Sequence, residues 1–411
     1  MENNNDIYKK ALELHAQNKG KISVNSKVRI ENSDDLSLAY SPGVAEPCRE
    51  ISDDPEKSYQ YTSRGNMIAV VSSGTAVLGL GDIGAEAALP VMEGKAILFK
   101  KFAGLDAFPV CLDTRDPDKI VETVKLLAPN FAGINLEDIA APECFYIEEK
   151  LKKETDLAIF HDDQHGTAIV ILAGLFNALD LTGQKLTESK IIINGAGASA
   201  TATVKLLRQA GVKGENIIVC DSTGIIYEGR KEGMNEAKKE LAAITNPGKI
   251  SGELDRAVEK ADIFIGLSVG GVLSENMVRD MADDPIIFAL ANPEPEINPQ
   301  SAVEAGAEII ATGRSDYPNQ INNVLAFPGV LRGAISVRSA EINNEMKLAA
   351  ARAIANLVKE PTSENIIPAP FQKGIAGEVA ISVAEAAMET GVAQKNRSRE
   401  DLQNEFADIT Y

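Results

Sequence analysis

Apolar residues recur along the chain in two distinct patterns. A helical spacing of apolar positions over 6–18 predicts an amphipathic helix near the N-terminus. Between residues 66 and 160 the apolar positions gather into short runs, separated by helical stretches such as Lys119–Leu127. We expect these runs to be strands; they read MIAVV, AILFK, AFPVCL and LAIF. The alternation predicts an α/β fold for this part of the chain.

From about residue 164 the same alternation is more regular. Helices are expected over 166–181 and 199–210. The apolar runs that accompany them read KIIIN, NIIVCD, DIFIGL, IIFALA and EIIAT. Nearly continuous apolar runs with helical spacers are typical of strands buried on both faces, so we expect a doubly wound, Rossmann-type parallel sheet. Helices over about 344–358 and 376–391 close the chain.

The chain is long enough for more than one hydrophobic core. Its 411 residues exceed the size at which single cores stop growing, which predicts two or three domains. We place a first α/β domain over 1–163, a Rossmann domain over 164–340, and C-terminal helices over 341–411 that could pack back on the first domain. This division predicts a cleft between the two larger units.

Composition and charge narrow the functional class. The formal net charge of −19 repels nucleic acid, and no basic stripe reverses this field locally. The N-terminal residues lack the basic start and apolar run of a signal peptide, and no apolar stretch reaches the length of a membrane span. The cysteines lie far apart, as expected of reduced thiols; they are Cys48, Cys111, Cys144 and Cys220. We therefore expect a cytoplasmic protein that binds neither nucleic acid nor membranes.

A Gly-rich turn in the second domain matches a dinucleotide-binding fingerprint. Gly195 and Gly197 follow the apolar run KIIIN, and Ala200 lies at the start of the next expected helix. The first glycine allows a tight turn, the second lets the backbone approach a pyrophosphate, and the small third residue allows close packing of helix on strand. We expect the whole turn to bind the cofactor: Gly195, Ala196, Gly197, Ala198, Ser199 and Ala200.

Asp221 bears on which dinucleotide this turn holds. It ends the run NIIVCD about 20 residues after the turn, where a carboxylate binds the ribose hydroxyls. A carboxylate repels the 2′-phosphate of NADP, and the following Ser222-Thr223-Gly224 offers no cation. NAD is therefore favoured over NADP, although a distant arginine or lysine could compensate.

The same glycine pattern occurs a second time, in the first domain. This copy runs from Gly79 to Gly84 and has Asp106 at a similar distance downstream. Pro90 falls about two turns into the helix that should follow, where proline removes a hydrogen bond and clashes with the preceding turn. No strand is expected to lead into Asp106. We therefore interpret this copy as a tight turn rather than as the cofactor site.

Two pairs of adjacent carboxylates, Glu137-Asp138 and Asp162-Asp163, are each flanked by apolar residues. A solvated surface is the ordinary place for such pairs, but this setting favours a partly buried position at the end of a strand. Buried carboxylates need a cation. Three or more carboxylate oxygens suit Mg²⁺ or Mn²⁺, so we predict a metal site here.

Two histidines beside the second pair do not form a zinc-protease motif. His161 and His165 stand four residues apart in HDDQH. Asp162 takes the place of the glutamate that a zinc protease needs, its side chain is too short to reach the same water, and no later histidine can act as a third ligand. We expect both histidines either to make local hydrogen bonds or to support the residues that bind the metal.

Lys95 and Tyr40 are candidates for proton transfer. Lys95 follows Gly94 and precedes the apolar run AILFK. A lysine held near a divalent cation in a cleft would lose proton affinity through desolvation and like charge, and could then act as a base near neutral pH. A solvated lysine and an ordinary core or rim tyrosine are the alternatives, and the residues alone do not decide between them.

Together these motifs resemble one family, the malic enzymes in their short prokaryotic form. Nine segments occur in the family's order across nearly the whole chain: AYSPGVAEPC, GTAVLGLGDIG, PVMEGKA, FAGLDAFPV, INLEDIAAPECF, FHDDQHGTAIV, NGAGASA, ANPEPEI and NNVLAFPGVLRGA. Two places depart from the pattern. Ala76 stands where the larger eukaryotic enzymes have an arginine, and PFQKGIAGEVA, which contains Lys373, differs from the usual sequence.

The resemblance implies an activity, a metal-dependent and NAD-linked oxidative decarboxylation of malate to pyruvate and CO₂, carried out by a homodimer. Tyr40 would protonate the enol intermediate and Lys95 would take the substrate hydroxyl proton, both in contact with substrate, while Asp162 would pair with Lys95. The other implied roles are metal binding by Glu137, Asp138 and Asp163, and contact with substrate and nicotinamide by Asn292, Asn322 and Asn323.

Three other functions stay open on the sequence. A malolactic-type enzyme would keep NAD bound and release lactate. An amino-acid or folate dehydrogenase would share the dinucleotide unit but would not need the acidic residues. A non-catalytic nucleotide-sensing protein would bind NAD without turnover.

Overall fold

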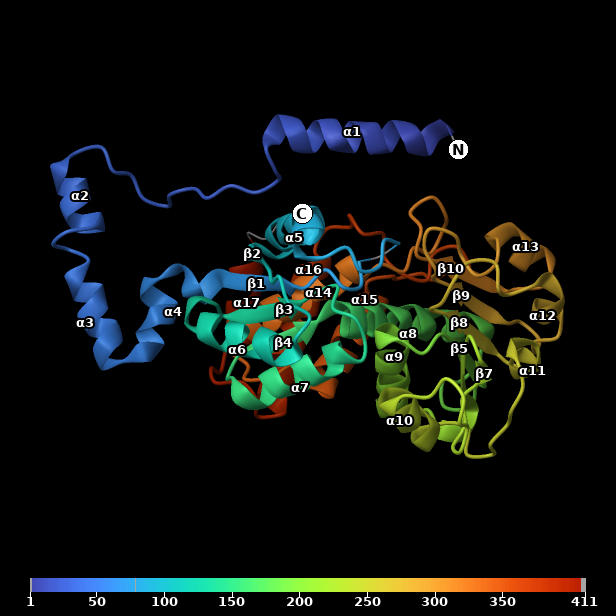
Figure 1. Cartoon of the computed structure of the whole chain (residues 1–411). Coiled ribbons are helices and arrows are strands. Elements are labelled where there is room, and N and C mark those ends of the chain that lie inside the picture. Colours follow the sequence, from blue (N-terminus) through green and yellow to red (C-terminus); the bar gives the residue numbers. More distant parts are fainter. Residues whose placement is uncertain (1, 78, 408–411) are drawn as a thin grey trace.

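The computed structural model describes residues 2–77 and 79–407. Two mainly parallel sheets lie at opposite ends of the body, with long helices between them (Figure 1). Among the described residues, the first sheet has four strands in the order β2-β1-β3-β4, and the second has six in the order β10-β9-β8-β5-β6-β7. The predicted α/β class with a Rossmann-type sheet is confirmed.

The first sheet forms at the centre of the N-terminal half. Its strands are β1 (Met67–Ser72), β2 (Asp106–Cys111), β3 (Gly133–Leu136) and β4 (Ala158–His161). The helices that connect them are α5 (Ala85–Ala103), α6 (Pro117–Leu127) and α7 (Glu143–Glu154). All neighbouring strands are parallel, so their carboxyl ends share one edge. The residues that follow β3 and β4 therefore lie near one another.

The run AILFK, predicted as a strand, lies instead in α5. It continues a helical stripe in which Met92, Ala96 and Phe99 are buried. Pro90 lies inside this helix, so the prediction that proline would interrupt it was wrong. Burial of the apolar stripe offsets the hydrogen bond that proline removes. Lys95 is therefore a helical residue on the buried side of α5.

The second sheet contains β5 (Ile191–Asn194), β6 (Ile217–Asp221), β7 (Gly224–Ile225), β8 (Ile263–Gly266), β9 (Ile286–Ala289) and β10 (Ile309–Thr312). Its helices are α9 (Ala198–Gln209), α10 (Glu236–Ile244), α11 (Leu254–Val258), α12 (Glu275–Arg279) and α13 (Pro299–Glu304). Only the short edge strand β7 is antiparallel to its neighbour among the described strands. Every residue of β5, β8 and β9 is buried, which explains their unbroken apolar sequences.

Helix α8 (Asp162–Thr182) leads from the first sheet to the second. It begins four residues before the predicted start at 166, so Asp162 and Asp163 form part of its first turn, where the helix dipole favours negative charge. By length and hydropathy alone α8 could cross a membrane, although no stretch of that kind was expected from the sequence. Because 67% of that segment is buried inside the protein, we describe α8 as a core helix.

The chain closes with η5 (Asn323–Leu325), α14 (Phe327–Ser336), α15 (Asn344–Asn356), α16 (Ile375–Glu389) and α17 (Arg399–Ala407). Helix α14 contacts α5 and α16, and α15 packs on α8. A Cβ atom on Gly333 would lie 2.3 Å from the Ala380 carbonyl oxygen, so α14 and α16 approach closely. The Phe327 ring lies 4.7 Å from that of Phe99 on α5. The C-terminal helices thus contact both the first domain and α8.

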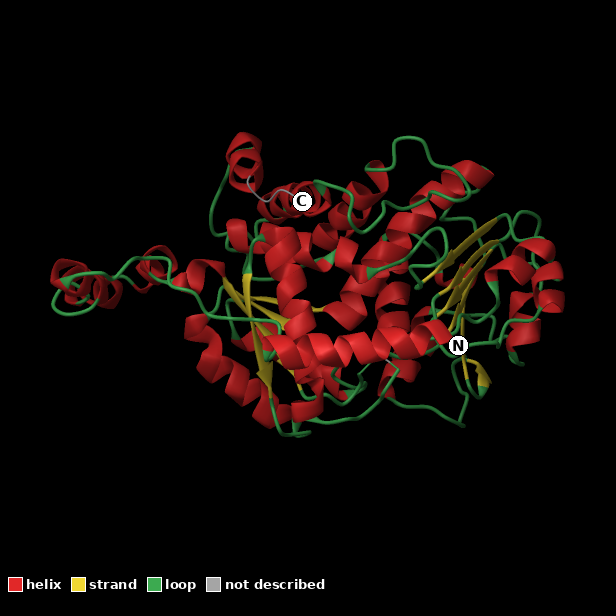
Figure 2. Cartoon of the chain, turned by 90° about the horizontal axis from the view of Figure 1, so that it is seen from above, coloured by secondary structure: helices red, strands yellow, loops and turns green. Residues whose placement is uncertain are grey.

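Residues 2–53 form an N-terminal arm that leaves the body. It contains α1 (Glu2–Asn18), α2 (Ser33–Ala39) and α3 (Ala45–Asp53), and α4 (Ser58–Tyr61) then leads toward β1. Figures 1 and 2 show α2 and α3 extending away from both sheets. No residue of α2 or α3 is buried. The large apolar side chains that the arm exposes include Ile7, Leu12, Val24, Val28, Ile30 and Leu38.

Candidate active site

Four carboxylates and one lysine meet at the carboxyl edge of the first sheet. Glu137 and Asp138 follow β3, and Asp162 and Asp163 begin α8 directly after β4. Lys95 reaches them from α5, with its Nζ 2.6 Å from Asp162 Oδ2 and 3.0 Å from Glu137 Oε1. The structure therefore brings Lys95 and Asp162 together and adds Glu137 as a second partner.

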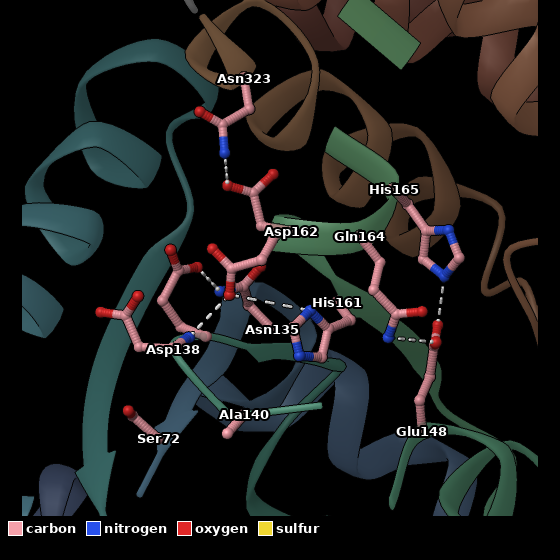
Figure 3. A network of polar contacts seen from close by, with 12 residues as sticks. Ser72, Asn135, Asp138, Ala140, Glu148, His161, Asp162, Gln164, His165 and Asn323 are labelled. Carbon is pink, nitrogen blue, oxygen red and sulfur yellow. Dashed lines mark hydrogen bonds and ion pairs between the residues drawn. The ribbon is translucent and has the colours of Figure 1, made fainter. Parts of the chain in front are cut away.

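Lys95 is enclosed and is only 9% exposed. Its Nζ lies 4.0 Å from the centre of the Phe327 ring, and the Asn323 amide donates a hydrogen bond to Asp162 Oδ2 (Figure 3). Burial disfavours the ammonium charge, but attraction to Asp162 and Glu137 outweighs it, so the pKa of Lys95 is raised. From the sequence we expected a nearby cation to lower the proton affinity of Lys95. In the structure the charges nearest to Lys95 are carboxylates, which have the opposite effect.

Glu137, Asp138 and Asp163 each direct one oxygen into a common space. These three oxygens lie within 4.8 Å of one another. Asp163 Oδ2 accepts a hydrogen bond from the Asp138 backbone N–H at 2.8 Å, and Asn135 donates one to Glu137 Oε2 at 2.8 Å. Asp138 itself has a left-handed backbone, with φ of 52°, and its Oδ2 is buried without a hydrogen-bond partner. We call Glu137, Asp138 and Asp163 the carboxylate triad.

The triad and Asp162 hold more negative charge than Lys95 can balance. Burial and repulsion from Asp163 and Glu137 raise the pKa of Asp138 to about 8. Burial likewise raises the pKa of Glu137 and of Asp163. A divalent cation would relieve this repulsion and give Asp138 Oδ2 a partner, and an all-carboxylate donor set suits Mg²⁺ or Mn²⁺. The residues therefore fit such an ion.

The glycine turn of the second domain connects β5 to α9. Gly195 has φ of 127°, and a Cβ atom there would lie 2.3 Å from the Leu267 carbonyl oxygen, so this position requires glycine. A Cβ atom on Gly197, the N-cap of α9, would meet nothing within 4 Å. Ala200 is fully buried, whereas Ala196, Ala198 and Ser199 are half-buried. Open space therefore lies at the helix N-terminus, where a pyrophosphate is expected.

The other glycine copy is built differently. Strand β1 ends at Ser72, well before Gly79, and Gly84 directly caps α5. Among the described residues no strand leads directly into that turn, although a helix without interruption follows it.

Asp221 lies at the end of β6, next to two cations. Its Oδ1 accepts a hydrogen bond from Arg230 Nη1 at 2.8 Å, and its Oδ2 lies 2.7 Å from Lys238 Nζ. Burial opposes the Asp221 charge, but the hydrogen bonds from Arg230 and Lys238 outweigh it and lower the pKa of Asp221 to about 2. The three residues after Asp221 offered no cation, but a distant arginine or lysine was left open; these two partners follow 9 and 17 residues later.

Comparison with known proteins places this arrangement in a family. The sequence matches the malic enzyme N-terminal domain over residues 17–152 and the malic enzyme NAD-binding domain over residues 164–390. The chain belongs to the malic enzyme family. An amino-acid or folate dehydrogenase, which the sequence left open, is therefore set aside.

Full-length relatives and a solved structure agree with this assignment. The chain is 59% identical to the bifunctional malic/malolactic enzyme of Bacillus subtilis, over 98% of each protein. It is 54% identical to the NAD-dependent malic enzyme of Geobacillus stearothermophilus, over 92% of this chain and 78% of that protein. The crystal structure of malic enzyme from Pyrococcus horikoshii superposes with a TM-score of 0.94 at 47% identity, covering 98% of this chain and 95% of the other. Other relatives, at 46% to 52% identity, are described as NADP-dependent or probable NADP-dependent malic enzymes. The chain covers only 51% to 52% of the length of five of them.

The structure does not bring Tyr40 to Lys95 within the same chain (Figure 1). Tyr40 follows α2 on the N-terminal arm and is 67% exposed. Figure 1 shows α2 well outside the body, whereas the carboxylates follow β3 and begin α8. A catalytic role for Tyr40 therefore requires a site other than the one in its own chain.

The three asparagines occupy different positions. Asn323 bonds to Asp162, whereas the Asn322 side chain accepts a hydrogen bond from the Val324 backbone N–H at 3.0 Å and caps η5. Asn292 is exposed just beyond β9. Because β9 is parallel to β8, and β8 to β5, Asn292 lies at the same sheet edge as the Gly195 turn.

Asn135 contacts Glu137 and Phe327 contacts Lys95, and neither was among the predicted site residues. A polar residue inside the buried strand β3 was the available signal for Asn135.

The histidines lie near the triad without belonging to it. His161 is buried with neither ring nitrogen hydrogen-bonded to a described residue, and His165 Nε2 lies 2.6 Å from Glu148 Oε1 (Figure 3).

Proposed function

We propose that this chain oxidises and decarboxylates malate to pyruvate and CO₂, with NAD as hydride acceptor and Mg²⁺ or Mn²⁺ as a required ion. The observation that carries the proposal is the Lys95 ammonium, buried between Asp162 and Glu137 at the edge of the carboxylate triad. Removing a hydroxyl proton next to a substrate carboxylate needs a base beside a cation site. Membership of the malic enzyme family supports malate as the substrate.

The divalent cation, the dinucleotide and the side chains of this chain would each supply a different part of the reaction. A divalent cation held by Glu137, Asp138 and Asp163 would polarise the C2 oxygen and stabilise the enolate charge left by loss of CO₂. A dinucleotide on the Gly195 turn would accept hydride from C2. Like charge from that cation would lower the proton affinity of Lys95, so that its neutral amine could take the hydroxyl proton. Asp162, itself held by Asn323, keeps that amine in position. Asn292, Asn322 and Asn323 contact substrate and nicotinamide.

We also propose that the enzyme is a cytoplasmic homodimer in which the N-terminal arm lies on the partner subunit. The arm exposes apolar side chains that its own chain does not cover, and the burial of such side chains drives association. The same contact would place Tyr40 at the partner's site, where it protonates C3 of the enol. One arrangement therefore accounts for both the exposed arm and the position of Tyr40.

Metal dependence is tested at Asp138. Asp138→Asn keeps a residue that tolerates the left-handed backbone but removes the charge of the unpartnered oxygen. We expect malate turnover with Mn²⁺ to fall at least about a hundredfold, and chelator to do the same to the native enzyme. Asp180→Asn, an exposed change near the other end of α8, is the control. Undiminished turnover in chelator would contradict a metal role.

Cofactor preference is tested at Asp221. Asp221→Ser would leave Arg230 and Lys238 without their shared carboxylate and available to a 2′-phosphate. We expect the ratio of kcat/KM for NADP to that for NAD to rise roughly ten- to a hundredfold, because charge-assisted hydrogen bonds to phosphate are strong. Glu228→Ser, which removes an exposed partner of Lys249, should leave the ratio unchanged. A native enzyme that already prefers NADP would refute the NAD assignment.

A malolactic outcome is the second candidate function. The relative from Bacillus subtilis is described as bifunctional, which favours this candidate over non-catalytic NAD sensing. Product analysis separates the three functions: free NADH with pyruvate supports the proposal, lactate without accumulating NADH supports the malolactic reaction, and NAD binding without either product supports sensing.

A further inference from the structure

The structure buries a second lysine, Lys347, behind the active site. Among the described lysines only Lys95 and Lys347 are buried, and Lys347 is 6% exposed. Lys95 has two carboxylates within 3.0 Å, but no described carboxylate lies within 4.0 Å of the Lys347 ammonium. Its polar contact is His165 Nε2, at 3.5 Å. Glu148 and Glu341 attract the Lys347 charge from farther away, but this attraction does not offset the cost of burying the ammonium.

Lys347 lines a cavity of about 700 Å³ between α7, α8, α9, α10 and the first turn of α15. Thr201 on α9 lines the same cavity, and its hydroxyl is buried without a hydrogen-bond partner. Lys152, Lys205 and Arg208 complete its basic lining. The cavity volume is within the range of small-molecule sites.

The carboxylates that line the cavity already have cationic partners. Glu148 is bonded by His165 at 2.6 Å, by Gln164 at 3.0 Å and by Lys152. Glu240 pairs with Lys205 at 3.2 Å. The remaining pairs are Glu149 with Lys153 and Glu236 with Lys239. Lys347 and Arg208 are left without a carboxylate partner among the described residues, and Arg208 donates instead to the Val212 carbonyl oxygen.

We propose that this cavity binds a small organic or inorganic anion through a carboxylate or phosphate group, with Lys347 and Thr201 as its principal donors. The charge of such an anion would balance the Lys347 ammonium, and its oxygens would accept from the Thr201 hydroxyl. Burial and the nearby Lys152 lower the pKa of Lys347 to about 7, so a bound anion would also restore its proton affinity.

The cavity is separate from the catalytic cluster but shares a helix with it. Figure 3 shows His165 and Glu148 on one side of the start of α8, and Asp162, Asn323 and Asp138 on the other. His165 follows Asp162 by three residues on α8. An anion at Lys347 would therefore act on the helix that carries Asp162 and Asp163. That catalytic consequence rests on the proposed function, whereas binding of the anion does not.

The test is isothermal titration of the full-length protein in saturating NAD, which occupies the phosphate-binding turn, without added metal or malate. Inorganic phosphate and succinate serve as separate probes. We expect at least one of them to bind, with an affinity at least about tenfold weaker in Lys347→Met, since removing a charged donor typically loses that much. Thr201→Val should weaken binding in the same direction. Lys185→Met, at an exposed lysine outside the cavity, is the matched control.

Each outcome decides the proposal. Binding of phosphate alone identifies a phosphate-type ligand, and binding of succinate alone identifies a carboxylate. Binding that is equal in the native protein, Lys347→Met and Thr201→Val would overturn the assignment to this cavity, as would no binding of either probe. Should Lys347→Met fail to fold, Thr201→Val decides by itself. The readout is heat of binding, so an absence of malate turnover leaves the test intact.

Discussion

Lys95→Met is expected to lower malate turnover by about a thousandfold, because a positioned proton acceptor contributes roughly 10²- to 10⁴-fold. Methionine can fill the space against Phe327, so the packing of α5 is largely retained. The lost group is the amine that lies 2.6 Å from Asp162 and 3.0 Å from Glu137. Steady-state NADH formation with malate and Mn²⁺ measures the change.

The same substitution removes the only cation that contacts Asp162 among the described residues. Unpairing a buried charge costs about 3–5 kcal/mol, so the unfolding temperature should fall in chelator and recover in part with Mg²⁺. Lys100→Met is the matched control, on the same helix but with an exposed side chain paired to Asp106. Near-native turnover in Lys95→Met would exclude Lys95 as the base. A similar loss in Lys100→Met would point to damage to α5.

A mixture of two inactive variants is expected to recover activity if Tyr40 works in the partner's site. Tyr40→Phe removes the acid and Lys95→Met removes the base, and each homodimer should be nearly inactive. In a mixed dimer, one site keeps Lys95 and receives an intact Tyr40. After equal mixing with subunit exchange, about a quarter of all sites should be complete, given an isologous dimer with random pairing.

If Tyr40 acts in its own chain, the expected fraction of complete sites is different. If Tyr40 served its own chain, every site in the mixture would lack one of the two groups and turnover would stay at the background of the homodimers. Sedimentation must show that both variants dimerise, and a mixture of Tyr40→Phe with Tyr40→Phe,Lys95→Met is the matched control that cannot recover. Full activity of Tyr40→Phe alone would exclude Tyr40 as the acid.

Local patterns predicted most of the sheet and the residues at its edge. Strands β5, β8 and β9 are buried throughout, so their apolar runs could be recognised without knowing their neighbours. A metal site could be predicted because apolar residues flank both carboxylate pairs, whereas the choice of three ligands among the four carboxylates came only from the family resemblance. The prediction of a strand at AILFK was wrong because five apolar or long residues fit either a strand or one face of a helix.

Other features depend on contacts that sequence patterns do not contain. Arg230 and Lys238 reach Asp221 only through the fold of the loop and α10 after β7. Lys347 is 182 residues from His165, so no local pattern connects them. Tyr40 shows a further limit, because a motif identifies a residue type but not the subunit in which it acts.

Helix α8 sets a mechanical condition on any opening or closing of the enzyme. Its 21 residues form a rod roughly 31 Å long, with the acidic cluster at one end and the second sheet beside the other. If the second sheet rotates together with α8 about the junction of β4 and α8, the carboxylates at that junction would move least. The Gly195 turn, at the far sheet, would move most.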